Sequence, residues 1–206
     1  ISQYVLEDIR ASRISDVAIV LGNVHAERVR EHYGDGSNFG VRITYVEQGE
    51  PRGIAHAIGL CSEFIGNERF VVYLGDNLLK GGMKKFVQRF DSEESLDALV
   101  LLTAVKEPQR FGVARFDEKG TLVELIEKPK VPPSNYAIAG VYFFTPLIFD
   151  AIKRLKPSWR GELEITEAIQ ILLNEGNNVA YDFIEGWWKD TGSAEDIIEA
   201  NRLVLD

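Results

Sequence analysis

Short apolar runs alternate with segments of helical spacing along the first half of the chain. The runs that predict buried strands occupy residues 17–21, 41–46 and 70–74. The segments whose apolar residues recur with helical spacing occupy residues 1–9, 24–33 and 54–64. Each run is short and rich in β-branched or aromatic residues, which favours a strand over a buried helix. Strand and helix in alternation predict an α/β fold with a mainly parallel sheet.

The pattern changes in the second half, where strands follow one another more closely. Further strands are predicted at residues 98–105, 113–116, 121–126, 136–145 and 179–184. Further helices are predicted at residues 146–155, 166–174 and 194–205. Gly120 supplies a turn between two of these strands and so predicts a hairpin. Because a hairpin is antiparallel, the sheet should be mixed, with helices on both of its faces.

Composition places the chain among ordinary globular proteins. Its 206 residues suffice for one domain with a sizeable core. The formal net charge of −9 argues against a nucleic-acid-binding surface, which needs a basic footprint. No apolar run reaches the ~20 residues of a membrane span, so no membrane partner is expected. Cys61 is the only cysteine and cannot form an internal disulfide, which favours a reducing, cytoplasmic compartment.

A carboxylate stands directly behind one of the predicted strands. Asp76 follows the apolar run 70–74 and Gly75, so it should emerge at the carboxyl end of that strand. In open α/β sheets, ligands bind in the crevice outside these ends. Asp190, far downstream beside Trp188, is a second candidate, although it is equally well placed to cap the helix that follows. Two such carboxylates brought together could hold a hard cation such as Mg²⁺.

Two further motifs place polar side chains at strand ends. The Gln48 amide, in a loop shaped by Gly49 and Gly53, carries donors and acceptors that suit the edge of a nucleobase. Glu127 and Lys128, side by side on a strand, should point to opposite faces, where one could reach a sugar hydroxyl and the other a phosphate. Taken alone, each motif is read more simply as an ordinary surface loop or strand end.

The remaining polar motifs favour structural roles. Residues 160–166 look like a loop that enters a helix, with Thr166 as the capping residue. His25, His32 and His56 lack the spacing of a zinc site and are expected to be structural or surface residues. The sequence contains no P-loop and no nucleophile elbow.

Taken together, these segments resemble the sugar-1-phosphate nucleotidyltransferases, and most of all the glucose-1-phosphate thymidylyltransferases. The segments that carry the resemblance follow the family's order at residues 48–57, 73–77, 111–113, 127–129, 134–142, 160–166 and 188–192. Each segment is weak evidence alone, but their order along nearly the whole chain is specific. The resemblance implies a Rossmann-like mixed sheet, mainly parallel, of the nucleotide-diphospho-sugar transferase type.

The resemblance also implies a nucleotide half-site. Asp76 and Asp190 would hold Mg²⁺, and Asp76 would lie against the nucleotide. Gln48 and the Gly53 backbone would read the pyrimidine base. Asp76, Asp190 and Lys128 would be the catalytic residues. In the implied reaction, an oxygen of the sugar-1-phosphate attacks the α-phosphorus of a nucleoside triphosphate, and pyrophosphate leaves.

A sugar-phosphate half-site follows from the same resemblance. Gly112, Glu127 and the backbone near Ile138 would hold the sugar. Lys128 would hold its phosphate, and Trp188 would pack beside the sugar. The expected product is a nucleotide-sugar, with glucose-1-phosphate or a related sugar-1-phosphate as the acceptor and dTTP as the leading donor.

The sequence departs from the family ahead of Ile1, where the family has a first strand and a Gly-rich, triphosphate-binding loop with an Arg. We therefore expect residues 1–206 to be a nucleotidyltransferase domain that lacks this strand and loop and is inactive without them. A UTP-dependent uridylyltransferase and a catalytically silent, nucleotide-sugar-binding subunit remain as alternatives. A homo-oligomer is expected.

Overall fold

The computed structural model describes residues 2–205, apart from the side chains of residues 194, 204 and 205. Ile1, expected on the apolar face of the first helix, lies outside the described residues. The α-helices are α1 (Ser2–Ala11), α2 (Ala26–Tyr33), α3 (Ile54–Leu60), α4 (Ser62–Ile65), α5 (Lys84–Ser92), α6 (Leu147–Lys153), α7 (Ile165–Asn174) and α8 (Ala194–Leu205). The strands are β1 (Asp16–Gly22), β2 (Arg42–Gly49), β3 (Phe70–Tyr73), β4 (Asn77–Leu79), β5 (Ala98–Ala104), β6 (Gly112–Phe116), β7 (Leu122–Glu127), β8 (Tyr136–Phe144), β9 (Val179–Phe183) and β10 (Trp188–Asp190).

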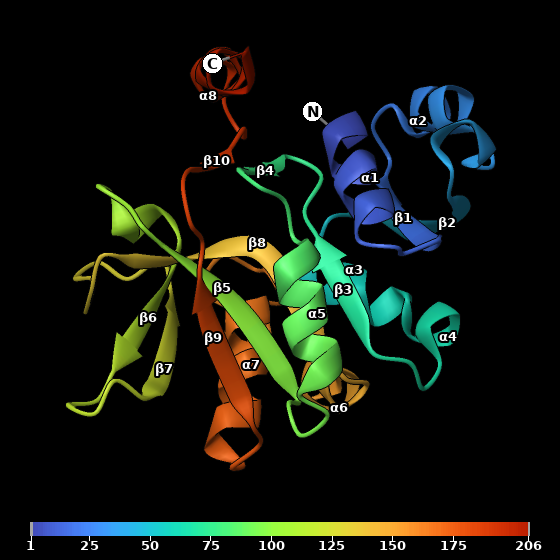
Figure 1. Cartoon of the computed structure of the whole chain (residues 1–206). Helices are drawn as coiled ribbons and strands as arrows, with labels where there is room; N and C mark the ends of the chain where they lie inside the picture. Colours follow the sequence, from blue (N-terminus) through green and yellow to red (C-terminus); the bar gives the residue numbers. More distant parts are fainter. Residues whose placement is uncertain (1, 206) are drawn as a thin grey trace.

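The main sheet is mixed, as predicted, but the expectation that it is mainly parallel was wrong for the described residues, because β8 runs antiparallel to each strand that it pairs with. Its strands lie in the order β7-β6-β8-β5-β9, and β3 also pairs with β8. Strand β8 runs antiparallel to β3, β5 and β6, whereas β5 and β9 are parallel. Strands β1 and β2 form a separate parallel pair, and β4 and β10 form a short antiparallel pair (Figure 1). The predicted hairpin is present as β6 and β7.

Helices cover both faces of the main sheet, because the central strands bury side chains on both sides. Val100 and Leu102 of β5 belong to one buried cluster, together with residues of α3, α6 and α7. Leu99 and Leu101, which point the opposite way, belong to a second cluster with residues of α1 and α5. The α/β class predicted from the sequence is confirmed.

Several short elements differ from the predicted ones. The helix predicted over residues 54–64 is divided at Cys61 into α3 and α4. Helix α5 was not predicted, although Phe86 and Phe90 lie on one face of it and are fully buried. Strands β4 and β10 were also missed, because each has only three residues.

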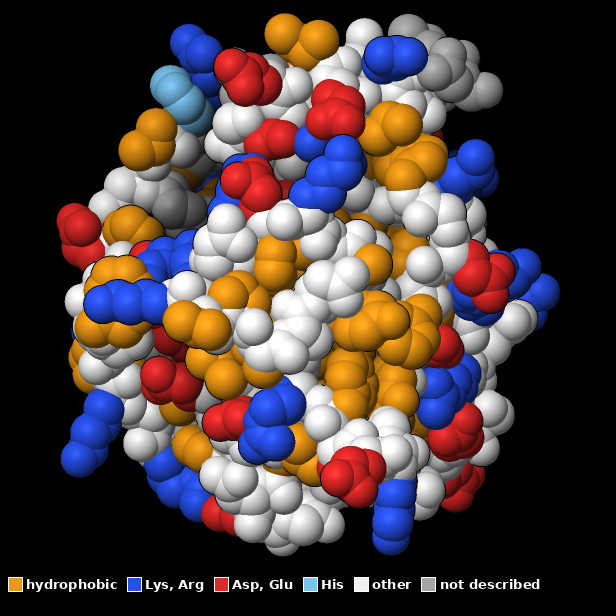
Figure 2. All heavy atoms as spheres, turned by 90° about the vertical axis from the view of Figure 1, so that its left-hand side faces the viewer, with side chains coloured by type: hydrophobic (Ala, Val, Ile, Leu, Met, Phe, Trp, Pro, Cys, Tyr) orange, Lys and Arg blue, Asp and Glu red, His pale blue; other side chains and the backbone are white. Residues whose placement is uncertain are grey.

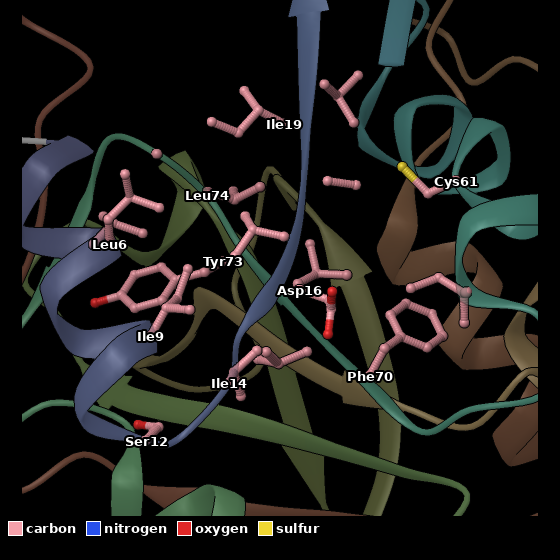
Figure 3. A pocket seen from close by; sticks show the side chains of 18 of the residues that line it. Leu6, Ile9, Ser12, Ile14, Asp16, Ile19, Cys61, Phe70, Tyr73 and Leu74 are labelled. Atoms are coloured by element: carbon pink, nitrogen blue, oxygen red, sulfur yellow. The ribbon is translucent and has the colours of Figure 1, made fainter. Parts of the chain in front are cut away.

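A large apolar cavity of about 1250 Å³ separates β1 from β3. Residues 16–21 line it from one side, and residues 70–75 line it from the other. In the described part of the chain, β1 pairs only with β2, and β3 pairs only with β8. Figure 3 shows Ile19 of β1 facing this space with Tyr73 and Leu74, while Leu6 and Ile9 of α1 close one end.

The surface on the side of β6 and β7 has an apolar centre and a charged surround. Apolar side chains gather across the middle of this face, and acidic and basic side chains surround them (Figure 2). No helix within residues 2–205 is long and apolar enough to cross a membrane.

Candidate active site

The two candidate metal ligands come together through the short β4–β10 pair. Asp190 lies opposite Asn77 in that pair. Asn77 is the residue that follows Asp76 in the chain. The Thr191 N–H and hydroxyl both donate to the Asp76 backbone carbonyl, at 2.9 Å and 2.6 Å. The structure therefore brings Asp76, in the turn directly before β4, beside the end of β10 that carries Asp190, although the sequence separates them widely.

Asn77 organises this region from a buried position. It is 1% exposed, and its Oδ1 accepts hydrogen bonds from the Gly140 N–H at 3.0 Å and the Trp188 indole N–H at 2.7 Å. Its Nδ2 donates to Asp76 Oδ1 at 2.7 Å. The Asn77 amide thus orients the Asp76 carboxylate and ties β8 and β10 to it. Sequence reasoning included Asn77 in a motif but gave it no role.

The Asp190 carboxylate sits in an environment that disfavours its charge. Burial raises the pKa of Asp190, and the nearby charge of Asp76 raises it further, while a hydrogen bond from the Gly192 N–H at 2.8 Å lowers it. Within residues 2–205, no three His, Cys, Asp or Glu side chains are grouped so that they could hold a metal ion. The protein therefore offers two carboxylates, and a cation here would take its other ligands from water or phosphate.

The predicted sugar-binding residues pack against one another. Gly112 lies opposite Glu127 in the β6–β7 hairpin. A Cβ atom at Gly112 would lie 2.6 Å from Thr166 Cγ2, 3.1 Å from Ile138 Cδ1 and 3.3 Å from Glu127 Oε2. Only glycine fits there, so the backbone of β6 approaches all three side chains closely.

Glu127 has partners that the sequence did not reveal. The Thr166 hydroxyl donates to Glu127 Oε2 at 3.1 Å, and Arg160 Nη1 lies 3.5 Å from Glu127 Oε1. Burial, and after it the charge of Glu164, raises the pKa of Glu127. Thr166 is therefore not the cap of α7, as the sequence suggested, because the helix begins at Ile165 and the Thr166 hydroxyl faces the sheet.

Lys128 lies outside the strand that carries Glu127. Strand β7 ends at Glu127, and Lys128 has a φ of +41°, in the left-handed region. Its N–H donates to the Phe111 carbonyl at 3.0 Å. The expectation that the two side chains alternate across a strand was wrong, because the backbone turns between them. A strained non-glycine residue often marks a functional position.

Two aromatic side chains connect the Asp76 and Asp190 carboxylates with the residues predicted to bind the sugar. The Trp188 ring packs edge-on against Phe111 at 5.2 Å between ring centroids, immediately before Gly112. Tyr142 of β8 is buried, and its burial raises its pKa, as do the charges of Glu127, Asp76 and Asp190. All three carboxylates are therefore within electrostatic reach of one buried hydroxyl.

The predicted base-reading residues also lie together. Gln48 Nε2 donates to the Gly53 carbonyl at 3.2 Å, and Gln48 lines the apolar cavity. Gly53 has a φ of +98°, and a Cβ atom there would lie 2.5 Å from the Leu163 carbonyl oxygen. The Leu163 N–H donates to the Arg52 carbonyl at 2.8 Å. The loop of residues 48–53, which the sequence predicts to read the base and which is called the base loop below, is thus joined to the loop that carries Arg160. Sequence reasoning assigned no ligand to the Arg160 loop.

Comparison with known proteins places this arrangement in a family. The model of the family described as nucleotidyl transferase matches residues 1–206. The low-salt glycan biosynthesis nucleotidyltransferase Agl11 of Haloferax volcanii is 49% identical over 99% of this chain and 57% of its own length. A glucose-1-phosphate thymidylyltransferase of Streptomyces antibioticus is 47% identical over 98% of this chain and 57% of its own length. The chain thus spans little more than half the length of these two relatives.

A solved structure shares the fold. A protein of Bacillus anthracis, provisionally described as a glucose-1-phosphate thymidylyltransferase and crystallised with a sucrose, superposes with a TM-score of 0.91 and 40% identity. The match covers 100% of this chain and 82% of that one. The carboxylates, the aromatic side chains and the base loop form one connected arrangement. Because the family model also matches the chain from end to end, the chain belongs to the nucleotidyl transferase family.

Proposed function

We propose that the protein transfers a nucleotidyl group from dTTP to glucose-1-phosphate or a related sugar-1-phosphate. An oxygen of the sugar phosphate attacks the α-phosphorus, a new P–O bond forms, and the bond to pyrophosphate breaks. The products are a nucleotide-sugar and pyrophosphate. The observation that carries the proposal is the connected arrangement of three predicted groups: the Asp76–Asp190 pair, the Glu127–Lys128 corner and the Gln48–Gly53 loop.

Asp76 and Asp190 would hold the divalent cation of this reaction, which we propose to be Mg²⁺. One oxygen of each carboxylate is held by a hydrogen bond, from Asn77 to Asp76 and from Gly192 to Asp190. The raised pKa of Asp190 reflects burial and the unfavourable proximity of Asp76, which a cation would relieve. Two carboxylates with water and substrate phosphates form a usual Mg²⁺ environment. A bound Mg²⁺ would neutralise charge on the phosphates.

The chain's own residues do the positioning in this proposal. The Lys128 ammonium neutralises the sugar phosphate, and Glu127, held by Thr166 and Arg160, accepts hydrogen bonds from sugar hydroxyls. Trp188 packs beside the sugar. Gln48 contacts the base. Such a reaction needs aligned reactants and stabilised charge more than covalent help from the protein.

Pyrophosphate release tests the proposal directly. The intact protein is incubated with Mg²⁺, glucose-1-phosphate and either dTTP or UTP. We expect release that requires both substrates and is lost in Asp76→Asn and Asp190→Asn. Faster turnover with UTP would instead make the protein a uridylyltransferase. Tight binding of nucleotide-sugar, without pyrophosphate release from either triphosphate, would identify a silent sensing subunit.

A further inference from the structure

His56 lies between two polar side chains of the base loop. Its Nδ1 is 3.3 Å from Gln48 Nε2, and its Nε2 is 3.0 Å from the Arg52 guanidinium. His56 sits on α3, one turn beyond Gly53, and is partly buried. We propose that His56 is a positioning residue, which fixes the Gln48 amide so that its carbonyl oxygen is offered to the base. This inference rests on the proposed function, in which Gln48 contacts the base.

The orientation of the Gln48 amide is set by the Gly53 carbonyl. A carbonyl can only accept a hydrogen bond, so the amide nitrogen and not the amide oxygen must face it. The second hydrogen of the same nitrogen then points to His56 Nδ1. With both hydrogens used, the free group of Gln48 is Oε1, an acceptor. An acceptor at this place pairs with a base that carries N3–H, as thymine and uracil do, and not with cytosine.

This arrangement requires one tautomer of His56. Nδ1 accepts a hydrogen bond only when the ring is neutral and its proton is on Nε2. Burial and the charge of Arg52 lower the pKa of His56, which favours the neutral ring. The Arg52 guanidinium can only donate, so its 3.0 Å contact with Nε2 belongs to the opposite tautomer, and the proposed tautomer requires the exposed Arg52 side chain to turn away from the ring. One neutral ring can accept from Gln48 or from Arg52, but not from both.

Two substitutions separate these contacts. The Asn side chain can place its Oδ1 near the position of Nδ1, so His56→Asn keeps the acceptor for Gln48 and loses the contact with Arg52. The longer His56→Gln places its amide near the position of Nε2, so it keeps a partner for Arg52 and loses the contact with Gln48. Both variants carry the same functional group, which makes each the control for the other.

The experiment measures KM and kcat with dTTP and with dCTP for the intact protein and both variants. We expect His56→Gln to raise the KM for dTTP about 5-fold or more and to reduce discrimination against dCTP, with kcat for dTTP nearly unchanged, as expected when one neutral hydrogen bond is lost. His56→Asn should stay within about 2-fold of the original protein on both measures. Equal effects of the two variants, or unchanged discrimination in His56→Gln, would overturn the proposal. Thermal melting checks that both variants are folded.

A third variant separates this inference from the proposed function. Gln48→Ala should raise the KM for dTTP at least as much as His56→Gln. If Gln48→Ala changes neither KM nor discrimination, then the assignment of Gln48 to the base fails. If Gln48→Ala has this effect and His56→Gln does not, then only the role of His56 is rejected.

Discussion

Lys128 combines an unfavourable backbone conformation with a proposed role at the sugar phosphate. A charge-assisted contact is worth about 1.5–3 kcal/mol, so Lys128→Ala should raise the KM for sugar-1-phosphate ~10-fold or more and spare the KM for triphosphate. Lys128→Gly should have the same kinetic effect and also relieve the left-handed strain at φ +41°, which stabilises the fold by about 1 kcal/mol. Steady-state kinetics and urea unfolding measure the two effects.

His25 is the matched control for this substitution. It too is a non-glycine residue in the left-handed region, with a φ of +60°, at the start of α2. His25→Gly should gain a similar stability without any change in KM. If Lys128→Ala raised the triphosphate KM instead, the two half-sites would be exchanged. If Lys128→Gly were less stable than the original protein, its backbone would not be strained.

Glu127 should make sugar binding sensitive to mildly acidic pH. Its pKa is raised above the ordinary value of 4.5, first by burial and then by Glu164. The carboxylate therefore takes up a proton at a higher pH than an ordinary Glu. Because the protonated form is a weaker acceptor, the KM for sugar-1-phosphate should rise as pH falls through this raised pKa. In Glu127→Gln the KM should be higher and should lose this dependence, and a pH profile of unchanged shape would contradict the assignment.

At the scale of elements, β4 and β10 depend on Asn77. A Cβ atom at Gly140 would lie 2.6 Å from Asn77 Oδ1, so Gly140→Ala should displace the amide and leave the indole N–H of Trp188 without its partner. A buried donor left unpaired costs about 1–3 kcal/mol. We expect unfolding at a lower urea concentration and a change in tryptophan fluorescence.

Gly22, at the end of β1, provides the comparison. A Cβ atom there would meet nothing within 4 Å, and the backbone is outside the left-handed region. Gly22→Ala should therefore be neutral or slightly stabilising, by up to about 1 kcal/mol, because it restricts the unfolded chain. Equal stability of the Gly140 and Gly22 variants would mean that Asn77 can repack without loss.

The elements that the sequence predicted are those with local signals. Buried strands such as β5 and β8 are continuous apolar runs, and the β6–β7 hairpin carries its turn glycine. Helix α5 was missed despite the spacing of Phe86 and Phe90, a signal that a search for helical periodicity would have found. Strands β4 and β10 could not be predicted, because three residues have no period and each strand exists only through its distant partner.

The same distinction holds for the candidate site. Residues within motifs, such as Gln48, Asp76 and Glu127, could be singled out from their neighbours in the chain. The residues that hold them could not, since Asn77 is defined by contacts with β8 and β10, and Thr166 by a contact with β7. Their roles follow from tertiary packing, which brings together segments that no local pattern relates.

At the scale of the whole molecule, the cavity between β1 and β3 should bind apolar dyes. It holds about 1250 Å³ and is lined mainly by aliphatic and aromatic side chains. The 206-residue chain should therefore enhance the fluorescence of anilinonaphthalene sulfonate while folded. Ile19→Ser, in the lining, should weaken the signal. Val131→Ser, which changes an apolar side chain that is 85% exposed and does not line the cavity, should leave the signal unchanged. Equal signals from both variants would place the dye elsewhere.

The separation of β1 and β2 from the main sheet has a consequence for cooperativity. No strand hydrogen bonds join the two sheets within residues 2–205, whereas β5 and β8 are hydrogen-bonded to each other and deeply buried. Regions that open locally exchange their amide hydrogens at a lower free energy than regions that open only on global unfolding. The β1–β2 pair should thus exchange as one early unit and β5–β8 as a late one. The 206-residue chain would then melt in two steps, each with its own temperature.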